Sequence, residues 1–83
     1  MEQLNILFTK SSIKEYKKLP LGYKKLIDNV LDKLSKNELI DIKPIQGEID
    51  IFRIRVGKYR ILIKKILPDV LVIKIDVRGD IYK

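Results

Sequence analysis

The stretch from Ile49 to Lys64 constrains the fold more than any other part of the chain. It reads I-D-I-F-R-I-R-V-G-K-Y-R-I-L-I-K, so apolar and basic residues alternate on both sides of a Gly-Lys pair. Alternation with period two is typical of a half-buried strand. Gly57 suits the first position of a type II′ turn, which requires a positive φ. The stretch therefore predicts a β-hairpin with the two-residue loop Gly57-Lys58.

The register of this hairpin predicts two chemically different faces. A two-residue loop sets Val56 opposite Tyr59 and Arg55 opposite Arg60. Like charges directly opposite each other destabilise a ladder, so the arginine pair indicates a site for an anion, with a plain solvated face as the alternative. The apolar face, assigned to the core, carries Phe52, Ile54, Val56, Tyr59, Ile61 and Ile63. The other face carries Arg53, Arg55, Arg60 and Lys64.

The residues before the hairpin predict one strand and two helices. The alternation of Leu4, Ile6 and Phe8 indicates the strand. Ser12 and Glu15 form an S-x-x-E capping box, which predicts a short helix that starts there and is interrupted by Pro20 and Gly22. The second helix has its apolar residues at helical spacing: Tyr23, Leu26, Ile27, Val30, Leu31 and Leu34. We expect a helical hairpin whose residues Leu26, Val30 and Leu34 pack on the apolar face of the sheet, and a loop over residues 35–48.

Residues 70–78 predict a last strand after the turn Leu67-Pro68-Asp69. Its apolar face is assigned Leu71, Ile73, Ile75 and Val77, and its other face Val72, Lys74, Asp76 and Arg78. Keeping these faces apart requires an odd loop or a bulge, because register follows the hydrophobic face. In the simplest register Asp76 lies opposite Arg60 and Arg78 opposite Lys58. The predicted class is α+β: an N-terminal strand, a helical hairpin and a three-stranded antiparallel meander, with the helices on one sheet face, in a single domain over residues 1–83.

Composition limits the chemistry that this chain can perform. Its 83 residues include neither Cys nor His, which excludes disulfides and thiolate metal sites and removes the usual zinc ligand and general base. We expect neither a metal nor a cofactor. The chain has no signal-peptide pattern and no apolar run of membrane-spanning length, so we expect a soluble, cytoplasmic protein without a membrane partner. A net charge of +7 favours a polyanionic partner, nucleic acid first.

The four arginines of the chain are all predicted to lie on one sheet face, away from the helices. A guanidinium group binds phosphate with two parallel hydrogen bonds, whereas Lys acts as a point charge. Their placement together therefore predicts an anion-binding surface.

Four segments, in this order along the chain, resemble the RelE/ParE toxin superfamily. They are K-E-Y-K-K-L-P (Lys14–Pro20), P-I-Q-G (Pro44–Gly47), F-R-I-R-V-G-K-Y-R-I (Phe52–Ile61) and V-R-G-D-I-Y (Val77–Tyr82). The resemblance implies the toxin of a toxin–antitoxin pair, held in a hetero-oligomer by its cognate antitoxin. In the RelE-like branch it implies cleavage of messenger RNA on the ribosome, without metal, by attack of a ribose 2′-hydroxyl on the neighbouring phosphate.

The resemblance also implies roles for individual residues. Arg60 and Arg78 match the arginines that stabilise charge on the pentacovalent phosphate, and Tyr82 matches a terminal tyrosine that stacks on a base. Arg53 and Arg55 match two basic residues before the turn. We expect Arg55 to act in catalysis as well as in binding. The expected RNA-binding set is Arg53, Arg55, Lys64 and Lys74.

Two departures from the family pattern leave other functions open. The positions of Arg53 and Arg55 are often Lys, and Arg cannot readily lose a proton to act as a general base. A His often precedes the last arginine, where this chain has Val77. The alternatives are a ParE-like poison of DNA gyrase and an inactive relative that only binds anions. For Tyr82, the alternatives are a frayed chain end and partial cover of the core.

Overall fold

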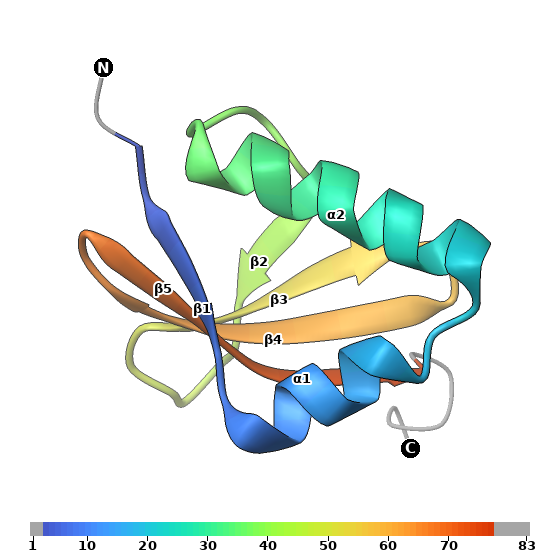
Figure 1. Cartoon of the computed structure of the whole chain (residues 1–83). Helices are drawn as coiled ribbons and strands as arrows, with labels where there is room; N and C mark the ends of the chain where they lie inside the picture. The colour runs from blue at the N-terminus through green and yellow to red at the C-terminus, as the bar shows by residue number, and fades with distance from the viewer. Residues whose placement is uncertain (1–2, 78–83) are drawn as a thin grey trace.

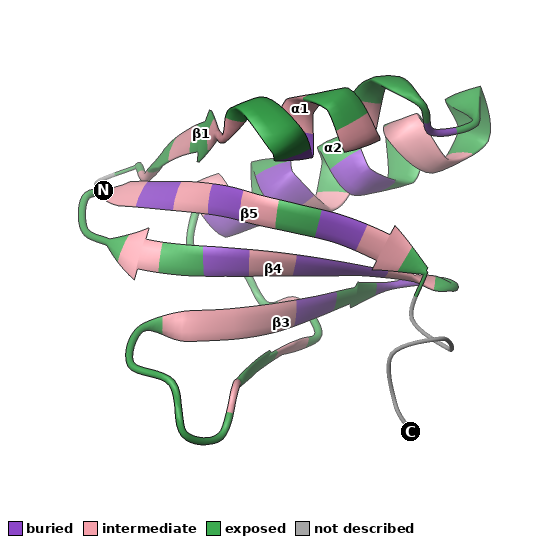
Figure 2. Cartoon of the chain, turned by 90° about the horizontal axis from the view of Figure 1, so that it is seen from below, coloured by how far each residue is buried: buried purple, intermediate pink, exposed green. Residues whose placement is uncertain are grey.

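The computed structural model describes residues 3–77, which form a five-stranded sheet with two helices on one face (Figures 1 and 2). The strands lie in the order β1-β5-β4-β3-β2, with β1 parallel to β5 and the other neighbours antiparallel. The elements are β1 (Asn5–Phe8), α1 (Lys10–Lys17), α2 (Leu21–Ser35), β2 (Ile42–Pro44), β3 (Ile51–Val56), β4 (Tyr59–Ile66) and β5 (Asp69–Val77). The predicted α+β class, with its helical hairpin and antiparallel meander, is confirmed.

The short strand β2 lies in the segment that we predicted to be a loop. Its residues Ile42, Lys43 and Pro44 pair with Ile54, Arg53 and Phe52 of β3. Pro lacks the N–H that a central strand needs, and Lys-Pro is typical of a turn. Because β2 is an edge strand, the N–H that Pro44 lacks does not interrupt the hydrogen bonds between the inner strands. The loop prediction was wrong for these three residues.

The hairpin formed by β3 and β4 has the predicted register. Val56 pairs with Tyr59, Arg55 with Arg60 and Ile54 with Ile61. Gly57 has a φ of +58°, as a type II′ turn requires. The Tyr23 ring lies close to this turn, since a Cβ on Gly57 would come within 3.0 Å of Tyr23 Cε1.

A bulge between β4 and β5 decides which residues of β5 face the core. The turn is Leu67-Pro68, and from it the register runs to the pair of Ile63 with Val72. The next residue of β4, Leu62, pairs with Lys74, so Ile73 has no partner and is the extra residue of the bulge. An extra residue reverses the alternation of a strand. The core therefore receives Val70 and Val72 before the bulge and Ile75 after it.

This arrangement corrects part of the prediction for the last strand. A bulge was expected as one of two solutions, and Asp76 does lie opposite Arg60. Val72, assigned to the polar face, is fully buried, whereas Leu71 and Ile73 are only half-buried. The physical reason is that residues 70–73 are all apolar, so their own pattern cannot reveal which of them point inward.

Helix α1 begins three residues earlier than the capping box predicted. Thr9 is the N-cap, and its hydroxyl accepts a hydrogen bond from the Ser12 N–H at 3.0 Å. Ser12 is fully buried and donates its hydroxyl hydrogen to the Val72 carbonyl at 2.8 Å. Glu15 does not close a capping box either, because its carboxylate accepts from the Ile75 N–H of β5.

Of the three α2 residues predicted to pack on the sheet, Leu34 is buried and Val30 is partly buried against the core, but Leu26 is 49% exposed. Ile27 and Leu31 are buried instead of Leu26. Periodicity identifies a stripe but not its centre, which the sheet beneath it determines. The buried core consists of Leu19, Ile27, Leu31, Leu34, Ile54, Val56, Ile61, Ile63, Val70, Val72 and Ile75.

Phe52 and Tyr59, both predicted for the core face, are partly buried and pack against this core. Neither helix within residues 3–77 has the length and apolar character needed to cross a membrane.

Candidate nucleic-acid interface

The face of the sheet opposite the helices carries a group of basic side chains that we call the basic face. Arg53 and Arg55 of β3 alternate with the core residues Ile54 and Val56, and Arg60 of β4 precedes the core residue Ile61. Side chains alternate between the two faces of a strand, so these arginines point away from the helices. The basic face comprises Lys43, Arg53, Arg55, Arg60, Lys64 and Lys74.

Two rows of side chains cross this face. Arg55, Arg60 and Asp76 lie side by side on β3, β4 and β5. The second row lies two residues further along each strand and consists of Lys43, Arg53, Leu62 and Lys74. Directly opposed residues of neighbouring strands have Cβ atoms about 4.5–5.5 Å apart, so one phosphate can contact two basic side chains of a row. The sequence does not predict Lys43 as part of this face, because its pattern predicts a loop where β2 lies.

The three described arginines differ in burial. Arg60, on the central strand β4, is 8% exposed, whereas Arg53 is half-buried and Arg55 is exposed. A guanidinium group stays charged even when buried. Arg60 therefore provides a fixed positive charge, and its neighbour Arg55 adds one that is open to solvent.

Lys74, predicted to bind RNA, lies between two carboxylates. Its Nζ is 3.4 Å from Asp76 Oδ2 and 3.5 Å from Glu15 Oε2. These two charges, Asp76 more than Glu15, raise the pKa of Lys74 above its usual value. An anionic ligand at Lys74 would have to compete with both acids.

Glu15 is a contact of the site that sequence analysis did not identify. It lies on α1, yet its Oε1 accepts a hydrogen bond of 2.8 Å from the Ile75 N–H and its Oε2 faces Lys74. The local signal, S-x-x-E, indicated a capping box instead. Glu15 and Ile75 are 60 positions apart in the sequence, and only the packing of α1 beside β5 brings them together.

Two predicted site residues, Arg78 and Tyr82, lie outside the described residues, as does the pairing of Arg78 with Lys58. The ladder between β4 and β5 is described up to the pair Tyr59 and Val77. Across residues 3–77, no three acidic side chains gather in a group that could hold a metal ion.

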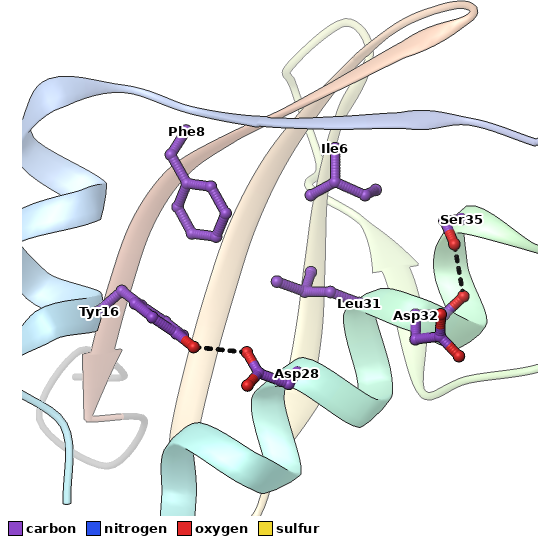
Figure 3. Close-up of a pocket in the computed structure, with 7 residues that line it drawn as sticks. All are labelled: Ile6, Phe8, Tyr16, Asp28, Leu31, Asp32 and Ser35. Atoms are coloured by element: carbon purple, nitrogen blue, oxygen red, sulfur yellow. Dashed lines mark hydrogen bonds between the residues drawn. The ribbon is translucent and has the colours of Figure 1, made fainter. Parts of the chain in front are cut away.

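A separate groove of about 380 Å³ lies on the helical side of the molecule (Figure 3). Ile6 and Phe8 of β1 point into it toward Tyr16 of α1 and Leu31 of α2. The Tyr16 hydroxyl donates to Asp28 Oδ1 at 2.6 Å, and this bond raises the pKa of Tyr16 above its usual value. The groove contains no residue of the basic face, so the two surfaces are distinct.

Comparison with known proteins identifies relatives along most of the chain, although no family profile matches it. The chain is 38% identical to the toxin RelE3 of Methanocaldococcus jannaschii over 63 residues, which span 70% of this chain and 72% of the relative. It is 30% identical to RelE1 of the same organism over 87 aligned positions, 98% of this chain and 97% of the relative. The RelB–RelE antitoxin–toxin complex from Methanococcus jannaschii contains a chain with the same fold, at a TM-score of 0.77 and 32% identity, covering 93% of this chain and 95% of that one.

Proposed function

Because the chain belongs to the RelE family of toxins, we propose that it inhibits translation by cutting messenger RNA on the ribosome. The observation that supports this most directly is the row of Arg55 and Arg60, in which a buried guanidinium lies beside an exposed one. Two like charges at neighbouring ladder positions cost stability, and a phosphate between them would offset that cost. A messenger provides such phosphates along its whole length.

The proposed reaction needs charge stabilisation at one phosphate. The ribose 2′-oxygen bonds to the adjacent phosphorus, and the bond to the 5′-oxygen of the next nucleotide breaks. A 2′,3′-cyclic phosphate and a 5′-hydroxyl result, with the proton lost at the 2′-oxygen balanced by the one gained at the 5′-oxygen. Arg60 would stabilise the pentacovalent phosphate, since a preorganised charge acts where new charge develops. Arg78 is proposed for the same role.

The other residues of the basic face would hold the substrate. Arg55 would contact the reacting phosphate beside Arg60, and Arg53, Lys64 and Lys74 the neighbouring ones. Contacts to phosphate position a nucleic acid without reading its sequence. Tyr82 is proposed to stack on a base next to the cut.

A cognate antitoxin is the proposed protein partner, in a hetero-oligomer, because the Methanococcus jannaschii relative was solved as a RelB–RelE complex. An antitoxin that places acidic residues against the basic face would compete with RNA for the same arginines. We therefore expect antitoxin binding and messenger cleavage to exclude each other.

The experiment is cleavage of a defined messenger by purified protein, with and without programmed ribosomes. The wild-type chain should cut only the ribosome-bound messenger. Arg60→Met should reduce the rate by about 10²- to 10³-fold, the loss typical of one preorganised donor. Lys25→Ala is the matched control, because it removes one positive charge from an exposed position of α2. Intact messenger with the wild-type protein would contradict the proposal.

A gyrase poison is the second candidate. It is favoured by the absence of His from the chain and by Arg at both basic positions of β3, which leave the basic face without an evident general base. A supercoiling assay run in parallel distinguishes the two: loss of supercoiling with intact messenger supports a gyrase poison. No effect in either assay supports an inactive anion-binding relative.

A further inference from the structure

The outer edge of β5 is only half covered by a neighbouring strand. β1 pairs with it from Asp69 to Val72, where Phe8 is the last partner, whereas β5 continues to Val77. Past that point α1 runs alongside β5 (Figure 2). The N–H of Ile75 on this edge finds its acceptor in Glu15 Oε1 at 2.8 Å. A helix side chain thus takes the place of a strand neighbour.

The second oxygen of Glu15 extends this contact to the basic face. Oε2 lies 3.5 Å from Lys74 Nζ, and Lys74 Nζ lies 3.4 Å from Asp76 Oδ2. Asp76 in turn is the cross-strand neighbour of Arg60. A continuous series of charged groups therefore connects α1, in the helical layer, with the arginine row on the opposite face.

A simple surface ion pair would not have this geometry. Exposed pairs are often worth little, since both long side chains remain mobile. Here one carboxylate has two partners in consecutive residues of β5, and one of the two is a backbone N–H, which cannot move independently of the strand. The Glu15 side chain is also only 30% exposed.

We propose that Glu15 is a positioning residue for the arginine row: it fixes the half-covered end of β5 and, through Lys74, the place of Asp76 beside Arg60. This inference rests on the proposed cleavage of RNA. Glu15 does not contact substrate in this scheme. Its loss should therefore lower kcat, because charge at the reacting phosphate is misplaced. KM should stay the same or fall, because the basic residues still bind RNA and Lys74 has one competing acid fewer.

The test compares three full-length variants. Glu15→Ala removes both contacts, Glu15→Gln keeps an acceptor for the Ile75 N–H but loses the charge facing Lys74, and Glu38→Gln is the control. Glu38 is an exposed acid just after α2, so its replacement changes the net charge equally without touching β5. The measurements are kcat and KM for ribosome-bound messenger, hydrogen exchange of the Ile75 amide, and the ¹⁵N signal of Arg60 Nε.

We expect a graded result. Glu15→Ala should speed exchange of Ile75 by about five- to tenfold, the effect of one lost hydrogen bond, and lower kcat by about tenfold. Glu15→Gln should retain slow exchange and lose less activity. Adding Lys74→Met to Glu15→Ala should cost less than the two separate losses combined, because both act through one connection.

Two results would overturn the inference. One is faster exchange of Ile75 in Glu15→Ala with unchanged kcat, which would make Glu15 purely structural. The other is an Arg60 Nε signal that is identical in wild type and Glu15→Ala. The Arg60 signal is measured on the free protein, so it still decides the inference if the wild-type chain cuts no messenger and the proposed function fails.

Discussion

Arg55 and Arg60 lie directly opposite each other across the ladder between β3 and β4. Asp76, on the other side of Arg60, offsets part of this repulsion, and Lys74 holds Asp76 in turn. Arg55, which is exposed, has Asp41 beside it at the β2 edge, since its backbone N–H donates to the Asp41 carbonyl at 3.0 Å.

The arginine pair predicts that activity and stability respond differently to one substitution. Arg60→Met keeps the apolar stem and removes the charge, so the free energy of unfolding should stay the same or rise slightly as repulsion is relieved. Urea unfolding at low and high salt measures this effect. Wild type should gain more stability from added salt than the variant, because salt screens the pair. If Arg60→Met unfolds the protein, Arg60 is a structural residue.

The orientation of α2 predicts a contrast between adjacent residues. Ile27 is fully buried and Leu26 is half-exposed. Ile27→Ala should cost about 2–5 kcal/mol of unfolding free energy, as for other large-to-small changes in a core. Leu26→Ala should stay within about 0.5 kcal/mol, as surface changes do. Equal losses in chemical denaturation would mean that the helix presents its stripe as the sequence analysis predicted.

The turn between β3 and β4 predicts that Gly57 tolerates no side chain. Gly57→Ala would combine a φ of +58° with a Cβ 3.0 Å from the Tyr23 ring, and should cost more than about 1 kcal/mol. Gly22→Ala is the control, because nothing lies within 4 Å of its added Cβ and Ala favours a helix. Its thermal midpoint should stay level or rise. Equal behaviour of the two variants would contradict the described turn.

The acids around Lys74 predict a loss of stability at high pH. Asp76 and Glu15 raise the pKa of Lys74 in the folded protein above the ordinary 10.5. The folded state then holds this proton more tightly than the unfolded state, so the stabilisation is complete below pH 10.5 and disappears as pH rises through the folded pKa. Lys74→Met should lack this component. The measurement is the difference in unfolding free energy between wild type and Lys74→Met from pH 8 to pH 11. A difference that stays constant over this range would contradict the prediction.

Sequence patterns predicted the β3–β4 hairpin because its determinants are local. Alternation on both sides of Gly57 specifies the register and so the pairing of Arg55 with Arg60. The inward residues of β5 were not predictable in this way, because residues 70–73 offer no polar position to mark the outer face. Val72 is buried because a bulge at Ile73 separates two stretches of opposite parity.

The contact of Glu15 with β5 was not predicted for a different reason. A Ser three residues before a Glu indicates a capping box, and Thr9 took that capping position instead. This left the Glu15 carboxylate available to a strand 60 residues away, for which no local pattern exists. The candidate site was thus predictable where it depends on one hairpin, and not where a helix supports it from the side.

The parallel pairing of β1 with β5 has a consequence for biosynthesis. Residues 5–8 gain their strand neighbour only when residues 69–72 have been made, and Asp76 follows still later. During translation, β1 therefore remains without its strand partner until almost all of the described chain has been synthesised. Because Asp76 lies in β5, the ribosome must complete this strand before Arg60 gains its last cross-strand neighbour, so the order of synthesis delays formation of the basic face.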